Sequence, residues 1–232
     1  MRFQSPLIKG VLLQRYKRFL ADIRLENGEI ITAHCPNSGS MKSCNVPGNP
    51  VMISHQDSPT RKLKYTWEMI QIDGKWVGIN TGHPNKLVAE AVGNQQIPDL
   101  TGYPVIRSEV KVGKHSRIDL VLENSDEQCY VEVKNVTLLE DGQAKFPDSI
   151  TERGQKHLKE LMALKKQGHR TVIFFVVQRE DARSFAPADD IDAMYGKLLR
   201  KAVLRSGVEA LVYQWRLSPE EIVISKKLQI NL

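Results

Sequence analysis

Two acidic residues, each inside an apolar segment, constrain the fold of this chain more than any other feature. Asp119 lies in the segment Arg-Ile-Asp-Leu-Val-Leu, and Glu132 lies in Tyr-Val-Glu-Val-Lys-Asn-Val. The polar stretch 123–128 between them is rich in turn formers, so the two segments are predicted to form an antiparallel hairpin. A turn centred on Ser125 and Asp126 places Asp119 directly across from Glu132. Because like charges at opposed positions destabilise a sheet, this pair requires a counter-charge.

The residues beside this pair indicate what supplies that charge. Side chains alternate along a strand, so Glu132 and Lys134 are expected to share one face of the hairpin with Asp119. Two carboxylates and the backbone carbonyl of Val133 would form the oxygen-rich shell that Mg²⁺ or Mn²⁺ accepts. Lys134 would hold a water molecule or a phosphate beside this ion. The predicted metal ligands are therefore Asp119, Glu132 and Val133. The predicted catalytic residues are Asp119, Glu132 and Lys134.

The same pattern resembles the active site of a known superfamily. An aspartate followed on the next strand by Glu-x-Lys is the arrangement of the PD-(D/E)XK nucleases, and Asp119, Glu132 and Lys134 match it. Ile118 stands where the superfamily name has proline, a position that binds nothing. Glu-x-Lys by itself is also common on a solvated strand face, where the two charges form a salt bridge. The order of the surrounding elements favours the nuclease interpretation.

That order is predicted from hydrophobic periodicity and turn residues. A helix at 85–92, with Asn85 as its N-cap, precedes a strand at 105–112 and then the hairpin. An amphipathic helix at 149–167 and a buried strand at 171–177 follow. The order αβββαβ is the core of the nuclease superfamily, so we expect an α/β (α+β) C-terminal domain with a mixed sheet. A helix at 191–206 and strands at 208–216 and 222–228 complete it.

Two further acids are candidates for this site. Glu90 lies on the first predicted helix, where several members of the superfamily place an additional acid, so we include it among the metal ligands. An exposed helix glutamate is the alternative interpretation. Glu109 ranks below Glu90, because strand alternation places it on a wet face with Arg107 and Lys111.

The start of the helix at 149–167 carries candidates for DNA contact. Unpaired N–H groups and a partial positive charge at a helix N-terminus favour phosphate binding. The predicted DNA-binding residues here are Arg153, Gln155, Lys156 and His157. The alternative is an ordinary charged helix face with ion pairs one turn apart.

The first 82 residues have a different character. Short strands without a convincing helix, with Asn-Gly and Asp-Gly turns between some of them, predict a small OB-like β-barrel. We therefore predict a barrel domain at 1–82 and the nuclease-like domain at 83–232. The barrel carries the charge excess, with 11 Lys and Arg against 6 Asp and Glu, whereas the remainder holds 22 against 21. The predicted strands cover 8–13, 19–25, 29–34, 50–55, 67–72 and 75–80.

Cations alternate with aromatic residues in one stretch of this barrel. The sequence Arg15-Tyr16-Lys17-Arg18-Phe19 has the composition with which proteins grip phosphates and stack on bases. Arg15, Lys17 and Arg18 are therefore predicted to bind DNA. The alternative is a solvated basic strand with buried rings.

The cysteines do not indicate a metal site. Cys35 and Cys44 lack the close spacing of structural zinc ligands. The Pro-Asn-Ser-Gly run at 36–39 between them is predicted to form a tight loop that meets a phosphate or the neighbouring domain. Three cysteines in 232 residues indicate a reduced protein without disulfides.

Charge and hydropathy limit the partners. A net charge of +6 favours an acidic partner such as DNA. The longest apolar run, at 171–177, is far too short to span a bilayer, and the chain begins without a hydrophobic signal segment. We therefore expect a cytoplasmic protein that does not enter a membrane.

A second resemblance extends over nearly the whole chain. The segments that carry it are 15–22, 34–41, 116–119, 132–138, 146–148 and 151–158. Together and in this order they resemble the sugar fermentation stimulation protein A (SfsA) family. The resemblance implies an N-terminal OB-like domain, a C-terminal nuclease-like domain and binding of DNA without marked sequence preference. It also implies a regulatory role in maltose or general sugar metabolism.

Two hypotheses from different classes stay open. The first is a regulatory protein that binds double-stranded DNA mainly through its phosphates. The second is a Mg²⁺- or Mn²⁺-dependent DNA endonuclease. RNA as the substrate is a third and weaker alternative, given the OB-like domain. The sequence contains no convincing helix-turn-helix and leaves a homodimer open.

Overall fold

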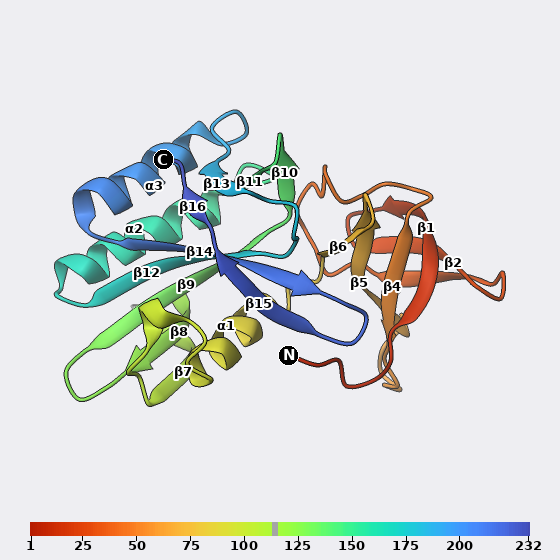
Figure 1. Ribbon diagram of the computed structural model, residues 1–232, viewed down its shortest axis with the longest axis horizontal. Coiled ribbons are helices and arrows are strands. Elements are labelled where there is room, and N and C mark those ends of the chain that lie inside the picture. Colours follow the sequence, from red (N-terminus) through yellow and green to blue (C-terminus); the bar gives the residue numbers. More distant parts are fainter. Residues whose placement is uncertain (113–115) are drawn as a thin grey trace.

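The computed structural model describes residues 1–112 and 116–232, with a barrel at one end and a larger mixed-sheet part at the other (Figure 1). The barrel sheet has the order β3-β2-β1-β4-β5-β6, and a parallel pairing of β3 with β5 closes five of these strands. Alternation explains these strands, since Ala21 and Ile23 are fully buried between wetter neighbours. The predicted OB-like barrel is confirmed. Its strands are β1 (Ile8–Tyr16), β2 (Leu20–Leu25), β3 (Ile30–His34), β4 (Pro50–His55), β5 (Tyr65–Ile72) and β6 (Lys75–Gly78).

The larger part is built on a second six-stranded sheet, in the order β15-β14-β12-β9-β8-β7. β9, β12 and β14 run parallel, while β7, β8 and β15 pair antiparallel with their neighbours. The predicted mixed sheet is therefore confirmed. Its strands are β7 (Val105–Val112), β8 (Ser116–Glu123), β9 (Gln128–Val136), β12 (Arg170–Val177), β14 (Glu209–Leu217) and β15 (Ile222–Lys227).

Helices cover both faces of this sheet. The helix α1 (Pro84–Gly93) packs on one face, in a core that includes Phe174 of β12, whereas α2 (Glu152–Lys166) and α3 (Ala193–Ser206) pack on the other, in a core that includes Phe175. Burial on two faces explains why β12 is an uninterrupted apolar run. The helix predicted from residue 149 begins at Glu152, because the Thr151 side chain accepts a hydrogen bond from the Gly154 N–H and caps it.

A small third sheet lies beside the barrel and was not predicted. Its order is β10-β11-β13-β16, and Figure 1 shows β10 next to the barrel loops. The loop after β3 contacts this sheet, where Lys42 pairs with Glu140 at 3.1 Å. The elements that the sequence did not predict are β10 (Leu138–Glu140), β11 (Gln143–Phe146), β13 (Ser184–Pro187), β16 (Gln229–Ile230) and the 3₁₀ turn η1 (Pro98–Leu100).

Two expectations about the whole chain can be compared with the structure. The three cysteines are free and buried, which agrees with the predicted absence of disulfides. Within residues 1–112 and 116–232, none of the helices has the length and apolar character needed to cross a membrane.

Candidate active site

A cavity of about 410 Å³ lies where the barrel meets the mixed sheet. The loop at 37–39 forms its wall on the barrel side, and most of the rest comes from α1, β7, β8, β9, β11, the segment 147–151 and α2. Its polar lining gathers residues from segments far apart in the sequence. Among the predicted site residues, it contains Asp119, Glu132, Val133, Lys134, Arg153 and His157.

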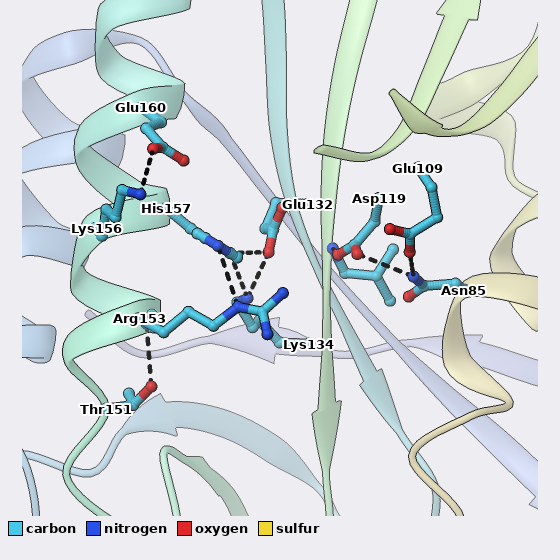
Figure 2. A network of polar contacts seen from close by, with 12 residues as sticks. Asn85, Glu109, Asp119, Glu132, Lys134, Thr151, Arg153, Lys156, His157 and Glu160 are labelled. Carbon is cyan, nitrogen blue, oxygen red and sulfur yellow. Dashed lines mark hydrogen bonds and ion pairs between the residues drawn. The ribbon is translucent and has the colours of Figure 1, made fainter. Parts of the chain in front are cut away.

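Glu132 is the buried centre of this cavity, with 1% of its surface exposed. One carboxylate oxygen, Oε1, accepts a hydrogen bond from Lys134 Nζ at 2.6 Å and is also hydrogen-bonded to His157 Nδ1. Lys134 Nζ lies 3.2 Å from the same His157 nitrogen, so the three side chains form a closed cluster (Figure 2). Burial raises the pKa of Glu132, but the His157 hydrogen bond and the Lys134 charge outweigh it, and the net pKa is lowered.

Asp119 reaches the cavity from the other side of β9. The hairpin register agrees with the prediction as far as Leu120, which pairs with Val131, and the ladder ends there. Beyond that end, Asp119 Oδ2 accepts the Val133 N–H at 2.8 Å, and Oδ1 accepts a hydrogen bond from Asn85 of α1 at 2.9 Å. Burial and the charge of Glu132 raise the pKa of Asp119.

The expectation that alternation gives the two acids one common face was wrong. Figure 2 shows Glu132 pointing toward α2 and Asp119 pointing toward Asn85, on opposite sides of the strand between them. The physical reason is the break in pairing at Asp119, opposite Glu109, whose backbone φ of 55° interrupts the β7–β8 ladder. Both carboxylates nevertheless line the same cavity.

The carboxylate oxygens of Asp119 and Glu132 are of the type that binds a hard cation such as Mg²⁺. Glu132 Oε2 is buried and has no hydrogen-bond partner among the described residues, although its neighbour Oε1 has two. A buried carboxylate oxygen without a partner is costly, and a cation bound in the cavity would satisfy it. No cluster of three or more His, Cys, Asp or Glu arranged for a metal occurs in the described part of the chain. Two carboxylates completed by water are the shell that Mg²⁺ tolerates.

The structure reverses the ranking of the two additional acids. Glu90 lies outside this cavity, because its carboxylate pairs with the Met1 amino group at 2.9 Å and lines a different cavity at the N-terminus. Glu109 lines the site and accepts a weak hydrogen bond from Asn85 at 3.4 Å. Asn85 was predicted as the N-cap of α1, but His83 holds that position and Asn85 faces Asp119 instead.

Only two of the four DNA-contact candidates on α2 reach the cavity. Arg153 and His157 line it, and the Arg153 Nε lies 3.5 Å from His157 Nε2. Gln155 donates to both carboxylate oxygens of Asp192, next to α3. Lys156 pairs with Glu160 one turn along the helix, at 3.6 Å. At the start of α2, Arg153 and His157 therefore face the cavity, whereas Gln155 and Lys156 make contacts within the protein outside it.

The predicted DNA-binding residues of the barrel also fall into two groups, because Arg15 is held by hydrogen bonds whereas Lys17 and Arg18 are exposed. Arg15 donates to the backbone carbonyls of Arg18, Asn37, Gly39 and Ser40, so its guanidinium braces the loop. Arg15 is thus better placed to hold the cavity wall than to meet DNA.

The predicted contact of the loop at 36–39 with the neighbouring domain extends to the residues that follow it. Asp148, which sequence reasoning missed, accepts the Met41 N–H at 3.1 Å, and Ser43 donates to the Thr137 carbonyl at 3.0 Å. Asp148 belongs to the segment 146–148 of the family resemblance, but no pattern predicts its contact with the barrel, because only the tertiary fold brings the two together.

Comparison with known proteins agrees with this arrangement. Residues 13–79 match the family model of the SfsA N-terminal OB domain, and residues 82–221 match that of the sugar fermentation stimulation protein RE domain. The sugar fermentation stimulation protein homolog from Geotalea uraniireducens is 57% identical, and the match covers 100% of this chain and 100% of the relative. The homolog from Geobacter sulfurreducens is also 57% identical, and the match covers 99% of this chain and 98% of the relative. The solved structure of Pyrococcus furiosus SfsA in complex with Ca²⁺ aligns with a TM-score of 0.90, at 29% identity, and covers 100% of this chain and 98% of that one.

Proposed function

Because the chain belongs to the sugar fermentation stimulation protein family, we propose that it is a DNA-binding protein that acts in sugar metabolism, with maltose as one sugar concerned. We further propose that its cavity hydrolyses DNA phosphodiester bonds with Mg²⁺ or Mn²⁺. The observation that carries this proposal is the meeting of Asp119, Glu132 and Lys134 with the cationic Arg153 in one cavity.

Binding to DNA is supported by where the cations lie. Lys17 and Arg18 on the barrel and Arg153 at the cavity are exposed, and the barrel sequence carries most of the net positive charge. Contacts of this kind neutralise phosphates without reading bases, so binding should weaken steeply with salt and depend little on sequence.

Hydrolysis is supported by the carboxylate pair. Asp119 and Glu132 would hold the cation, which when bound lowers the pKa of a water ligand and neutralises charge on the phosphate. The Ca²⁺ in the Pyrococcus furiosus relative supports a divalent cation in this family. Residues around these two acids would position them and would contact the phosphate and the attacking water.

Each surrounding residue has a position that suits one task. His157 and Lys134 hydrogen-bond to Glu132 Oε1, which leaves Oε2 available to bind a cation. Asn85 orients the Asp119 carboxylate by donating a hydrogen bond to it. The Lys134 ammonium lines the cavity and can donate to a phosphate oxygen or to the attacking water. Arg153 is exposed at the rim, where its planar guanidinium can orient a phosphate by two parallel hydrogen bonds.

The test is cleavage of supercoiled and linear DNA by the purified protein, with Mg²⁺, Mn²⁺ or chelator. We expect nicking with either metal, none in chelator, and at least about a hundredfold loss in Asp119→Ala. Glu90→Gln is the matched control, because that acid lies outside the cavity, and it should cleave like the parent. Absence of nicking under every condition would reject hydrolysis. DNA binding in chelator would then remain as the activity of the protein.

A further inference from the structure

The turn between β1 and β2 holds two cations in an unfavourable backbone conformation. Lys17 and Arg18 have φ values of 48° and 64°, in the left-handed region that Gly and Asn occupy more readily. Both side chains are exposed, and no ion pair involves either of them within the described residues. Tight turns between antiparallel strands use this conformation, so the informative observation is that both cations are exposed and unpaired.

An exposed aromatic pair lies directly beside these cations. Phe19 is 46% exposed, and its ring stacks on His34 with 6.4 Å between the centroids and 23° between the planes. Phe19 does not belong to the barrel core. Aromatic rings next to unpaired cations form the surface on which bases stack while phosphates are neutralised.

This surface is joined to the cavity through a short, braced stretch of chain. The Phe19 carbonyl accepts the Cys35 N–H at 2.8 Å, and the cavity-lining Asn37 is only two residues further, at most about 7 Å along the chain. Arg15 holds both parts together, because it donates to the Arg18 carbonyl at 2.9 Å and to the Asn37 carbonyl at 2.8 Å.

We propose that Lys17, Arg18, Phe19 and His34, the barrel platform, bind an unpaired segment of DNA and present it to the cavity. The bases of a duplex are stacked on each other, so only an unpaired base offers its face to a ring. A cavity of about 410 Å³ also has the size of a small-molecule site and is large enough for a nucleotide unit. The preferred substrate class is therefore DNA with a single-stranded region, such as an overhang or a flap. Its role as a substrate rests on the proposed hydrolysis, whereas its binding does not.

The test measures binding in chelator by fluorescence anisotropy, with a short oligothymidine, the same strand in a duplex, and an oligouridine. We expect the parent protein to bind the oligothymidine most tightly. Phe19→Ala should weaken that binding about tenfold, because it removes one stacking surface. Replacing both Lys17 and Arg18 with Gln should reduce the slope of log affinity against log salt by about 1.4, which corresponds to two lost phosphate contacts.

Arg24→Gln and Ile30→Ala are matched controls on the same hairpin. These residues are exposed and face each other across β2 and β3, at the opposite end from His34. Both variants should bind the oligothymidine like the parent. Thermal unfolding of every variant separates a lost contact from a lost fold, and the exposure of Phe19 predicts that Phe19→Ala melts like the parent.

Several outcomes would overturn the platform. Equal or tighter binding to the duplex, or an unchanged affinity in Phe19→Ala, would remove the argument for unpaired bases. Tighter binding to oligouridine would assign the surface to RNA. If the protein nicks no DNA but Phe19→Ala still weakens single-strand binding, the platform stands and hydrolysis fails. If the protein cleaves fully paired and single-stranded DNA equally and Phe19→Ala binds like the parent, hydrolysis stands and the platform fails.

Discussion

Asp119 and Glu132 experience opposite electrostatic environments although they share one cavity. Burial and the nearby Glu132 charge raise the pKa of Asp119, so the fold disfavours its ionised form. For Glu132, the contacts with His157 and Lys134 outweigh burial and lower the pKa, so the fold favours its ionised form. One acid is therefore held ionised by its neighbours, and the other lacks a counter-charge of its own.

This asymmetry predicts unequal effects of neutralising the two acids on stability. In chelator at pH 7, Asp119→Asn should change the free energy of unfolding by less than about 1 kcal/mol, because the lost repulsion from Glu132 is offset by an amide NH2 group that faces the Val133 N–H or the Asn85 amide. Glu132→Gln should lower it by about 3 kcal/mol, because it leaves the largely buried Lys134 ammonium without its carboxylate partner. Urea denaturation measures both values.

Added Mn²⁺ supplies the control for this prediction. A cation that binds only the folded protein stabilises it by about 2.7 kcal/mol at a hundred times its dissociation constant. The parent should gain stability with Mn²⁺, and both variants should lose that gain. If Asp119→Asn destabilised the protein as much as Glu132→Gln, the electrostatic account of the pair would be incorrect.

At the scale of elements, sequence pattern was informative where an element is long enough to show a period. The strands of the barrel and the six strands of the mixed sheet were predicted within about three residues of their ends, as were the three helices. The strands β10, β11, β13 and β16 contain only two to four residues each, which is too few for alternation to be visible.

The candidate site divides in a similar way. Asp119, Glu132 and Lys134 were found because their spacing on adjacent strands is itself a local pattern. Asn85 and Asp148 were not, because each becomes part of the site only when α1 or the loop before α2 packs against another element. The direction of Asp119 could not be predicted either, since the backbone irregularity at Glu109 leaves no mark in the sequence.

One buried acid connects two elements near the site. Glu68 of β5 is 5% exposed and accepts hydrogen bonds from Ser54 at 2.6 Å and from Asn80 at 2.7 Å. It also lies 2.7 Å from Nε2 of His83, the residue that precedes α1. Burial raises the pKa of Glu68, but these contacts outweigh it and the net pKa is lowered.

The lowered pKa fixes the pH dependence of this connection. A carboxyl group with a folded-state pKa below its unfolded value stabilises the fold at neutral pH and loses that effect as pH falls through the folded-state pKa. Glu68→Gln should therefore cost about 2 kcal/mol at pH 7, and its difference from the parent should shrink below about pH 4. Urea denaturation across this pH range is the measurement. The exposed Glu29→Gln is the control, and stability curves for Glu68→Gln and the parent that stay parallel in acid would contradict the argument.

At the scale of the whole molecule, the cavity depends on how firmly the barrel is attached. Arg179 is almost completely buried at this junction, where it donates to the Thr137 carbonyl at 2.7 Å and to Ser43 Oγ at 3.2 Å. The Gly78 N–H adds a backbone hydrogen bond to the Gln178 carbonyl. Because the barrel wall belongs to a different part of the fold from Asp119 and Glu132, such contacts help to keep the cavity in shape.

Gly39 lies at this junction where there is no room for a side chain. A Cβ atom at Gly39 would collide with the Asp148 carboxylate, which accepts the Met41 N–H. Gly39→Ala should therefore displace Asp148, cost about 2 kcal/mol of stability and lower the rate of DNA cleavage. Gly93→Ala in α1 is the matched control, because its added methyl would meet only Ile106 at 3.7 Å, an ordinary contact. Urea denaturation and the nicking assay measure the two effects.

A double-mutant cycle decides whether this one contact is the cause. Asp148→Ala removes the obstructing carboxylate, so the Gly39→Ala change should be far better tolerated in that background. We expect the double variant to be more stable than the sum of the single effects predicts, by at least about 1 kcal/mol. Strict additivity would show that Gly39 is required for another reason, such as its backbone conformation, and that the barrel wall does not depend on this contact.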